Sequence, residues 1–107
     1  MIEVRRFVSD SGVDVVGRWL ADLNDNRARA RINARIARLA AGNFGDCKPV
    51  GNAVFELRID YGPGYRVYFA RIGPSVVLLL LGGDKRRQSA DISRAIKFWR
   101  DYLKGNL

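Results

Sequence analysis

Residues 54–85 read VFELRIDYGPGYRVYFARIGPSVVLLLLGGDK, and this segment predicts three consecutive strands. In residues 54–60, every second side chain is apolar, and the positions between them include all the charged side chains. This is the pattern of a strand with one covered face. After a turn rich in glycine and proline, residues 65–72 alternate again. Residues 76–81 are apolar throughout, which predicts a central strand covered on both faces. The short connections make these three strands an antiparallel meander.

The segments on either side of this stretch predict one more strand and three helices. Residues 2–8 predict a short strand at or near a sheet edge. Apolar side chains at helical spacing predict helices over residues 13–23, 27–41 and 88–103. Residues 43–52 form a glycine-rich connector that leads into the meander.

These elements predict an α+β fold in the order β-α-α-β-β-β-α, with a small twisted sheet packed against helices. The sequence has 107 residues. This length favours a single domain over residues 1–107. Four aromatic side chains are expected in the core rather than as stacking surfaces: Trp19, Phe98, Trp99 and Tyr102.

Composition narrows the range of functions. The formal net charge is +8, which favours a polyanion or an acidic protein as partner. The sequence contains no histidine and one cysteine, so Ser-His-Asp machinery, Cys-His machinery and the usual zinc sites are excluded. No metal or cofactor is expected. No apolar run is long enough to span a membrane and the first residues lack signal-peptide features, so a cytoplasmic location without membrane contact is expected.

Arg58 and Arg66 lie on adjacent predicted strands and can be neighbours across the hairpin. Two guanidinium groups in that position can hold one phosphate and stabilise its transition state. The alternative is that both arginines are solvated or bonded to Glu56 and Asp60.

Lys85 and Arg86 follow two glycines at the end of a strand and precede the last predicted helix. Helix N-termini favour anions, so this position suits a phosphate. The alternative is a charged loop in which Asp84 caps the helix.

The second predicted helix carries arginines but no carboxylate. Because like charges on one helix repel each other, Arg31 and Arg35 predict contact with RNA or an acidic partner. The alternative is a solvated helix face.

Three segments together resemble the RelE/ParE toxin superfamily, and more closely its phage-derived, RelE/HigB-like addiction module killer branch. They are GNFGDCKPVG, FELRIDYGPGYRVYF and LLLLGGDKRRQSADISRA. The resemblance covers nearly the whole chain. It implies the toxin of a type II toxin–antitoxin pair that cleaves messenger RNA on the ribosome. It also implies a cognate antitoxin, which is a helix-turn-helix DNA-binding protein. The toxin is then expected at operator DNA only as part of its complex with this antitoxin.

The resemblance also implies roles for single residues. Arg66 stabilises the phosphate, helped by Arg58, and Lys85 or Arg86 assists the leaving oxygen. Further RNA contacts are expected from Tyr68 and Gln88, and Gln88 and Asp91 match the Q..DI pattern of the family. Lys48, in the connector, is expected to add a phosphate contact, and the alternative is a solvated loop lysine.

The general base stays open at this stage. Some RelE relatives use a tyrosine where this chain has Ile92, and HigB relatives use histidines. The candidates are Glu56, Asp60, Tyr68, Asp91 and a Lys85 of lowered pKa, although Asp91 also suits the first turn of a helix. Two other functions remain open: a ParE-like inhibitor of DNA gyrase, and an inactive toxin-fold protein that retains antitoxin binding.

Overall fold

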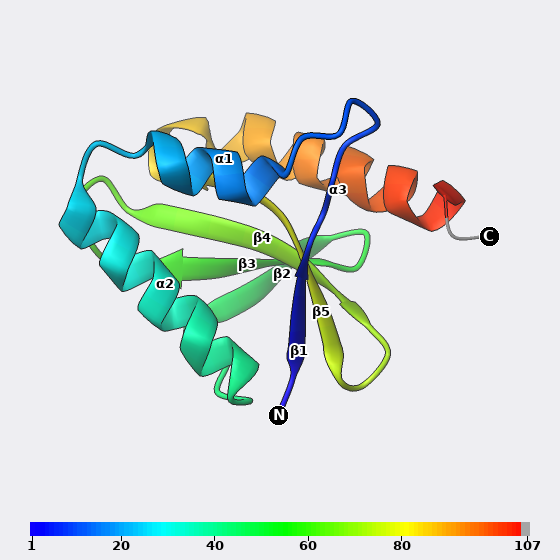
Figure 1. The fold of residues 1–107 in the computed structure, drawn as a ribbon, viewed down its shortest axis with the longest axis horizontal. Coiled ribbons are helices and arrows are strands. Elements are labelled where there is room, and N and C mark those ends of the chain that lie inside the picture. The colour runs from blue at the N-terminus through cyan, green and yellow to red at the C-terminus, as the bar shows by residue number, and fades with distance from the viewer. Residues whose placement is uncertain (106–107) are drawn as a thin grey trace.

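The computed structural model describes residues 1–105, which form a five-stranded sheet and three α-helices (Figure 1). In chain order the elements are β1 (Glu3–Arg6), α1 (Val15–Asp22), α2 (Asn26–Ala40), β2 (Cys47–Gly51), β3 (Val54–Ile59), β4 (Tyr65–Ile72), β5 (Val76–Asp84), the 3₁₀ turn η1 (Lys85–Arg87) and α3 (Gln88–Gly105). The α+β class predicted from the sequence is confirmed. None of these helices is long and apolar enough to cross a membrane.

The strand order across the sheet is β1-β5-β4-β3-β2. The last four strands in the chain form an antiparallel meander, whereas β1 pairs in parallel with β5, so the sheet is mixed. The edge position of β1 and the central position of the apolar strand β5 agree with the predictions.

The connector predicted over residues 43–52 is wrong in part, because Cys47–Gly51 forms the edge strand β2. The structure therefore has one strand more than the predicted order. This segment lacks alternating apolar residues, and its proline is tolerated because the strand lies at an edge. Asn52 and Ala53, with φ angles of 54° and 66°, form the tight turn into β3.

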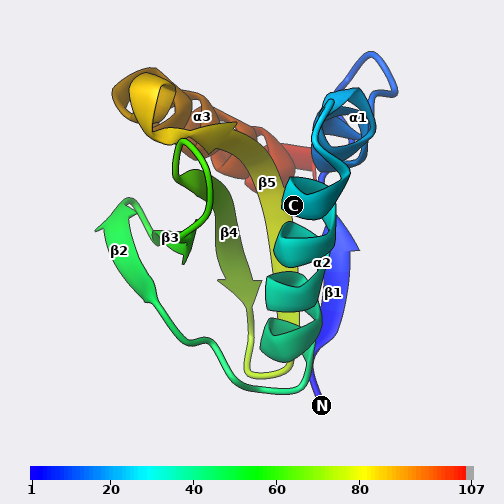
Figure 2. The ribbon, with the colours of Figure 1, turned by 90° about the vertical axis from the view of Figure 1, so that its left-hand side faces the viewer.

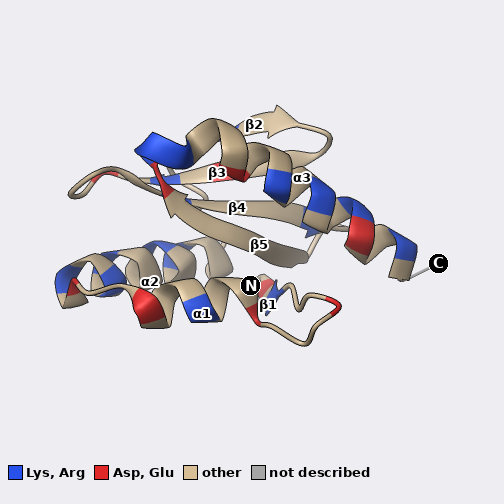
Figure 3. Cartoon of the chain, turned by 90° about the horizontal axis from the view of Figure 1, so that it is seen from above, with Lys and Arg blue, Asp and Glu red and all other residues tan. Residues whose placement is uncertain are grey.

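Helices cover both faces of the sheet. The α1 and α2 helices lie on one side and α3 lies on the other (Figures 2 and 3). Each side has its own apolar core. The core beneath α1 and α2 includes Val16, Ile32, Leu57, Phe69 and Leu79, and the core beneath α3 includes Tyr68, Leu78, Leu80, Ala95 and Trp99.

The start of α3 covers part of the charged face of the β3–β4 hairpin. Alternation in β3 predicted that Glu56 and Arg58 point to an open polar face. That face is instead turned toward α3, and Glu56 is 0% exposed. The helix begins at Gln88, beside Glu56 (2.8 Å from Gln88 Nε2 to Oε2), so its N-terminal turn closes this part of the sheet.

Candidate functional site

A buried carboxylate, Glu56, accepts hydrogen bonds from three side chains and forms an ion pair with a fourth. Arg58 Nε lies 3.2 Å from Oε1, and Arg66 Nε lies 3.4 Å from Oε2 at ion-pair distance but outside hydrogen-bonding geometry. The Tyr68 hydroxyl and Gln88 Nε2 both donate to Oε2, over 3.3 and 2.8 Å. We call these five residues the arginine–glutamate cluster. Its carboxylate has the partners that a buried charge requires.

Strand register builds most of this cluster. Arg58 lies opposite Arg66 in the β3–β4 pair, and Glu56 lies opposite Tyr68. Directly opposite residues in an antiparallel pair project to the same face, so the four side chains meet. The predicted cross-strand pairing of the arginines is confirmed, and so is the alternative that they bond to Glu56.

Two exposed lysines flank the cluster. Lys48 lies opposite Glu56 in the β2–β3 pair. Lys85 donates its backbone N–H to the carbonyl of Gly64, which also accepts from Arg66 Nη1 at 2.9 Å. The site therefore has a positive excess, with lysines at its accessible rim and arginines held further in.

Burial decides which groups of the cluster can react. The side chain of Arg66 is 11% exposed and that of Arg58 is 35% exposed, so Arg58 is more open to a ligand. Burial raises the pKa of Tyr68, and the charge of Glu56 raises it further. Tyr68 therefore stays protonated at neutral pH and acts as a donor, not as a base. The arrangement can bind and stabilise a phosphate group.

Other predicted site residues do not join the cluster. Arg86 pairs with Asp84 over 3.1 Å, and its side chain is 82% exposed. The hydrogen bond from Arg86 lowers the pKa of Asp84. Asp60 is exposed beyond the end of β3, and Asp91 lines a different cleft, between α1 and α3.

Arg31 and Arg35 lie on α2, on the opposite face of the sheet. The expectation that Arg35 contacts RNA is wrong, because it is only 8% exposed. Its guanidinium donates to the backbone carbonyls of Phe44, Asp46 and Arg58 over 3.3–3.4 Å, and burial lowers its pKa. Arg35 is a structural clamp between α2 and the start of the meander. Arg31 is exposed over the ring of Tyr61.

The sequence placed Glu56 among the candidates for acid–base chemistry and also left open that it bonds the two arginines, and the structure shows the second arrangement. The spacing of Glu56, Arg58 and Arg66 carried that signal once β3 and β4 were paired. The contribution of Gln88 could not be found this way, because it depends on where α3 returns to the sheet. Within residues 1–105, no group of three or more histidine, cysteine or carboxylate residues could hold a metal ion.

No family model matches this chain. It is similar to an uncharacterized protein of Haemophilus influenzae, with 56% identity over 77 residues. The match covers 72% of this chain and 78% of the relative. Identity of this level over most of both chains implies common ancestry and a common fold. The chain therefore belongs to the same family as this Haemophilus protein.

Proposed function

We propose that this protein is a RelE-like toxin of a type II toxin–antitoxin pair, and that it cleaves messenger RNA on the ribosome. The observation that carries the proposal is the cross-strand pair Arg58 and Arg66, anchored on Glu56 and flanked by Lys48 and Lys85. The antiparallel meander between helices and the three motif segments support a RelE-like topology.

In the proposed reaction the ribose 2′-OH attacks the adjacent phosphorus. A bond forms between the 2′-oxygen and phosphorus, and the bond from phosphorus to the 5′-oxygen breaks. The products are a 2′,3′-cyclic phosphate and a 5′-OH, and the proton lost by the nucleophile is balanced by one gained by the leaving oxygen. Arg66 and Arg58 stabilise the negative charge of the transition state, and Lys85 assists the leaving oxygen.

Glu56 is a positioning residue in this mechanism. Its carboxylate already accepts from Tyr68 and Gln88 and pairs with both arginines, so it is poorly suited to accept another proton. Instead it fixes the guanidinium groups before the RNA arrives, which lowers the entropic cost of binding. We assign acceptance of the 2′-OH proton to solvent.

The proposed partners follow from the same charges. The messenger RNA backbone binds the cationic rim on the translating ribosome in the cytoplasm. A cognate antitoxin with a helix-turn-helix DNA-binding domain covers the cluster and silences it, and carries the toxin to operator DNA. Carboxylates of the antitoxin are expected to pair with Lys48, Arg58 and Lys85.

The test is controlled expression followed by sequencing of messenger-RNA 5′ ends. Arg66→Ala is expected to lower cleavage about 10²–10³-fold, because one charged donor to the transition state is lost. Arg66→Lys should also be impaired, since an ammonium cannot make a two-pronged contact. Arg71→Ala, on the same strand but outside the cluster, is the matched control. A ribosome-bound message with a 2′-deoxy sugar at the cut should resist cleavage, and cutting at an undiminished rate would contradict the mechanism.

One observation favours a second function, binding without cleavage. Both arginines are already paired with Glu56, and Tyr68 is held protonated. Such a protein would keep its antitoxin and lack nuclease activity. Intact RNA without toxicity supports this reading. Intact RNA with stalled replication supports a ParE-like inhibitor of DNA gyrase instead.

A further inference from the structure

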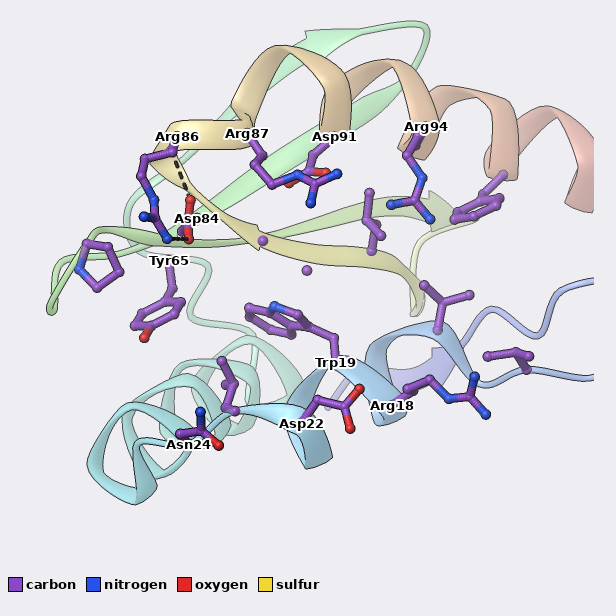
Figure 4. A pocket seen from close by; sticks show the side chains of 18 of the residues that line it. Arg18, Trp19, Asp22, Asn24, Tyr65, Asp84, Arg86, Arg87, Asp91 and Arg94 are labelled. Atoms are coloured by element: carbon purple, nitrogen blue, oxygen red, sulfur yellow. Dashed lines mark hydrogen bonds and ion pairs between the residues drawn. The ribbon is translucent and has the colours of Figure 1, made fainter.

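A second cleft lies between α1 and α3 and is separate from the arginine–glutamate cluster. Its volume is about 730 Å³, and none of the five cluster residues lines it. The pairing of β1 with β5 ends at Leu79, so within residues 1–105 no strand covers the adjoining edge of Leu81–Asp84. This edge is the back wall of the cleft. Figure 4 shows Trp19 facing it from α1, and Arg87, Asp91 and Arg94 reaching it from η1 and α3.

Asp91 is the unusual group in this cleft. It is 3% exposed, and its Oδ2 has no hydrogen-bond partner among residues 1–105. A Cβ atom at Gly83 would lie 2.0 Å from Oδ2, so only glycine lets the carboxyl group sit against the strand. Burial raises the pKa of Asp91, although Arg87 and Arg94 oppose this effect. A buried carboxylate without donors is costly, and a ligand that brings donors would remove that cost.

Trp19 provides a flat apolar wall. A Cβ atom at Gly82 would lie 2.1 Å from Trp19 Cε3, so the indole rests directly on the glycine backbone. Its ring also meets that of Tyr65 edge to face, with centroids 6.2 Å apart. Trp19 packs beside the core, as expected, but it is only partly buried and also lines the cleft. An aromatic wall of this kind stacks with planar rings, including nucleobases.

Basic and acidic side chains line different parts of the cleft. Arg18, Arg87 and Arg94 line it, and none of them makes an ion pair within the described residues. Asp22 and Asp25 lie at the end formed by the C-terminal turn of α1 and the following connection. An anionic group is therefore favoured on the α3 side, near Asp91.

The ligand must combine a planar ring, an anionic group and adjacent hydrogen-bond donors for a carboxylate. Guanine presents N1–H and a 2-amino group side by side. Adenine and cytosine present one amino donor beside an acceptor, and uracil presents one N–H between two carbonyl oxygens. We propose that the cleft between α1 and α3 binds a guanine nucleotide, with the base edge on Asp91, the ring against Trp19 and the phosphate near Arg87 and Arg94. This inference goes beyond RNA cleavage and does not depend on it.

The first test is titration of the intact protein with 5′-GMP, AMP, CMP and UMP at equal ionic strength. Their phosphates carry equal charge, so non-specific attraction to a protein of charge +8 cancels in the comparison. GMP is expected to bind about tenfold or more tightly than the others. In NMR spectra, the indole N–H signal of Trp19 should shift while that of Trp99 stays in place. Equal affinity for the four nucleotides would overturn the proposal.

Asp91→Asn keeps the size of the side chain but replaces one acceptor with a donor. It is expected to weaken GMP binding about tenfold or more and to reduce the preference over AMP. Asp101→Asn, on the same helix and outside the cleft, should leave GMP binding unchanged. Unchanged affinity in a folded Asp91→Asn variant would rule out the assigned contact.

Arg94→Gln tests the phosphate contact with an exposed residue, so folding is preserved. GMP binding should weaken and become less sensitive to salt, whereas Arg100→Gln on the same helix should have no effect. Unchanged binding and salt dependence in Arg94→Gln would contradict the phosphate position.

The source of the nucleotide is decided by comparing GMP with single-stranded RNA pentamers that carry one central G or A. A preference for the G pentamer assigns the cleft to a base of an RNA strand. Binding of GMP without binding of either pentamer assigns it to a free nucleotide. Pentamer binding without preference for G would count against the proposal, even if RNA cleavage is established separately.

Discussion

Glu56 and Asp91 are both acidic residues buried on the side of the sheet that α3 covers, with exposures of 0% and 3%. Glu56 accepts hydrogen bonds from Arg58, Tyr68 and Gln88 and forms an ion pair with Arg66 as well, whereas Asp91 Oδ2 has no hydrogen-bond partner in residues 1–105. Burial alone therefore does not define the role of a carboxylate. A carboxylate with a full set of partners positions its neighbours, and one that lacks donors beside a cleft is suited to a ligand.

The largest effect on stability is expected from removing the negative charge of Glu56 from the arginine–glutamate cluster. Glu56→Gln keeps the volume but leaves two arginines without their counter-charge, and should lower the free energy of unfolding by about 3 kcal/mol. The loss is expected at the lower end of the range for breaking a buried ion pair, because Arg58 can turn toward water. Denaturant titration measures the change, and Glu3→Gln in the exposed pair with Arg5 should alter stability little. Equal small losses in both variants would show that Glu56 does not anchor the cluster.

The next effect concerns the close contact of Asp91 with β5. Gly83→Ala places a methyl group against Oδ2 and should cost about 1–2 kcal/mol, because the carboxyl group has to move. Adding Asp91→Ala to this variant should recover part of the loss in a double-mutant cycle. Gly105→Ala is the control, since nothing lies within 4 Å of the added atom. Additive losses would indicate that residues 83 and 91 are not in contact.

A smaller loss is expected when Glu56 loses one neutral donor. Tyr68→Phe removes the hydroxyl that donates to Oε2 and should destabilise the fold by about 1 kcal/mol. Tyr65→Phe, on the opposite face of the same strand, serves as the control. A loss as large as that of Glu56→Gln would mean that the hydroxyl, rather than the ion pairs, dominates the cluster.

The smallest effect should have the opposite sign. Because the pKa of Asp91 is raised on folding, its ionised form opposes folding at pH values above that raised pKa. Asp91→Asn should therefore raise the melting temperature slightly at neutral pH, and the gain should shrink as the pH falls through that pKa. Asp84 has a lowered pKa, so Asp84→Asn should lose stability at neutral pH, and this loss should shrink in acid. Melting curves between pH 3 and 8 distinguish the two variants. The same change of melting temperature with pH in both variants would contradict the opposite pKa shifts of Asp91 and Asp84.

Alternation predicted the three central strands and the cross-strand placement of Arg58 and Arg66, because a period of two fixes which residues share a face. It did not predict that Glu56 is buried. Local pattern marks a residue as polar, but whether water reaches it depends on α3, which is distant in the chain. The edge strand β2 was missed for a related reason, since backbone pairing holds it and its sequence shows no alternation.

The burial of Arg35 is a second feature that the local sequence pattern did not predict. Its position between Ile32 and Leu39 puts it on the buried stripe of α2, yet a run of arginines indicated a solvated or ligand-binding face. The acceptors that make its burial possible are backbone carbonyls, including that of Asp46. Backbone acceptors carry no side-chain signature, so the sequence alone could not distinguish a clamp from an RNA contact.

The parallel pairing of β1 with β5 has a consequence for synthesis of the protein. Glu3 lies opposite Val76, so β1 forms only after the intervening chain has been made. At a rate of protein synthesis of about 5–20 residues per second, roughly 4–15 s pass between the synthesis of β1 and that of its partner strand. Its sequence, Glu-Val-Arg-Arg, is largely charged and exposed, which discourages pairing with strands of other nascent chains during this interval. A variant with apolar residues at Arg5 and Arg6 would preserve the final register but expose each new chain to aggregation while it is still being translated.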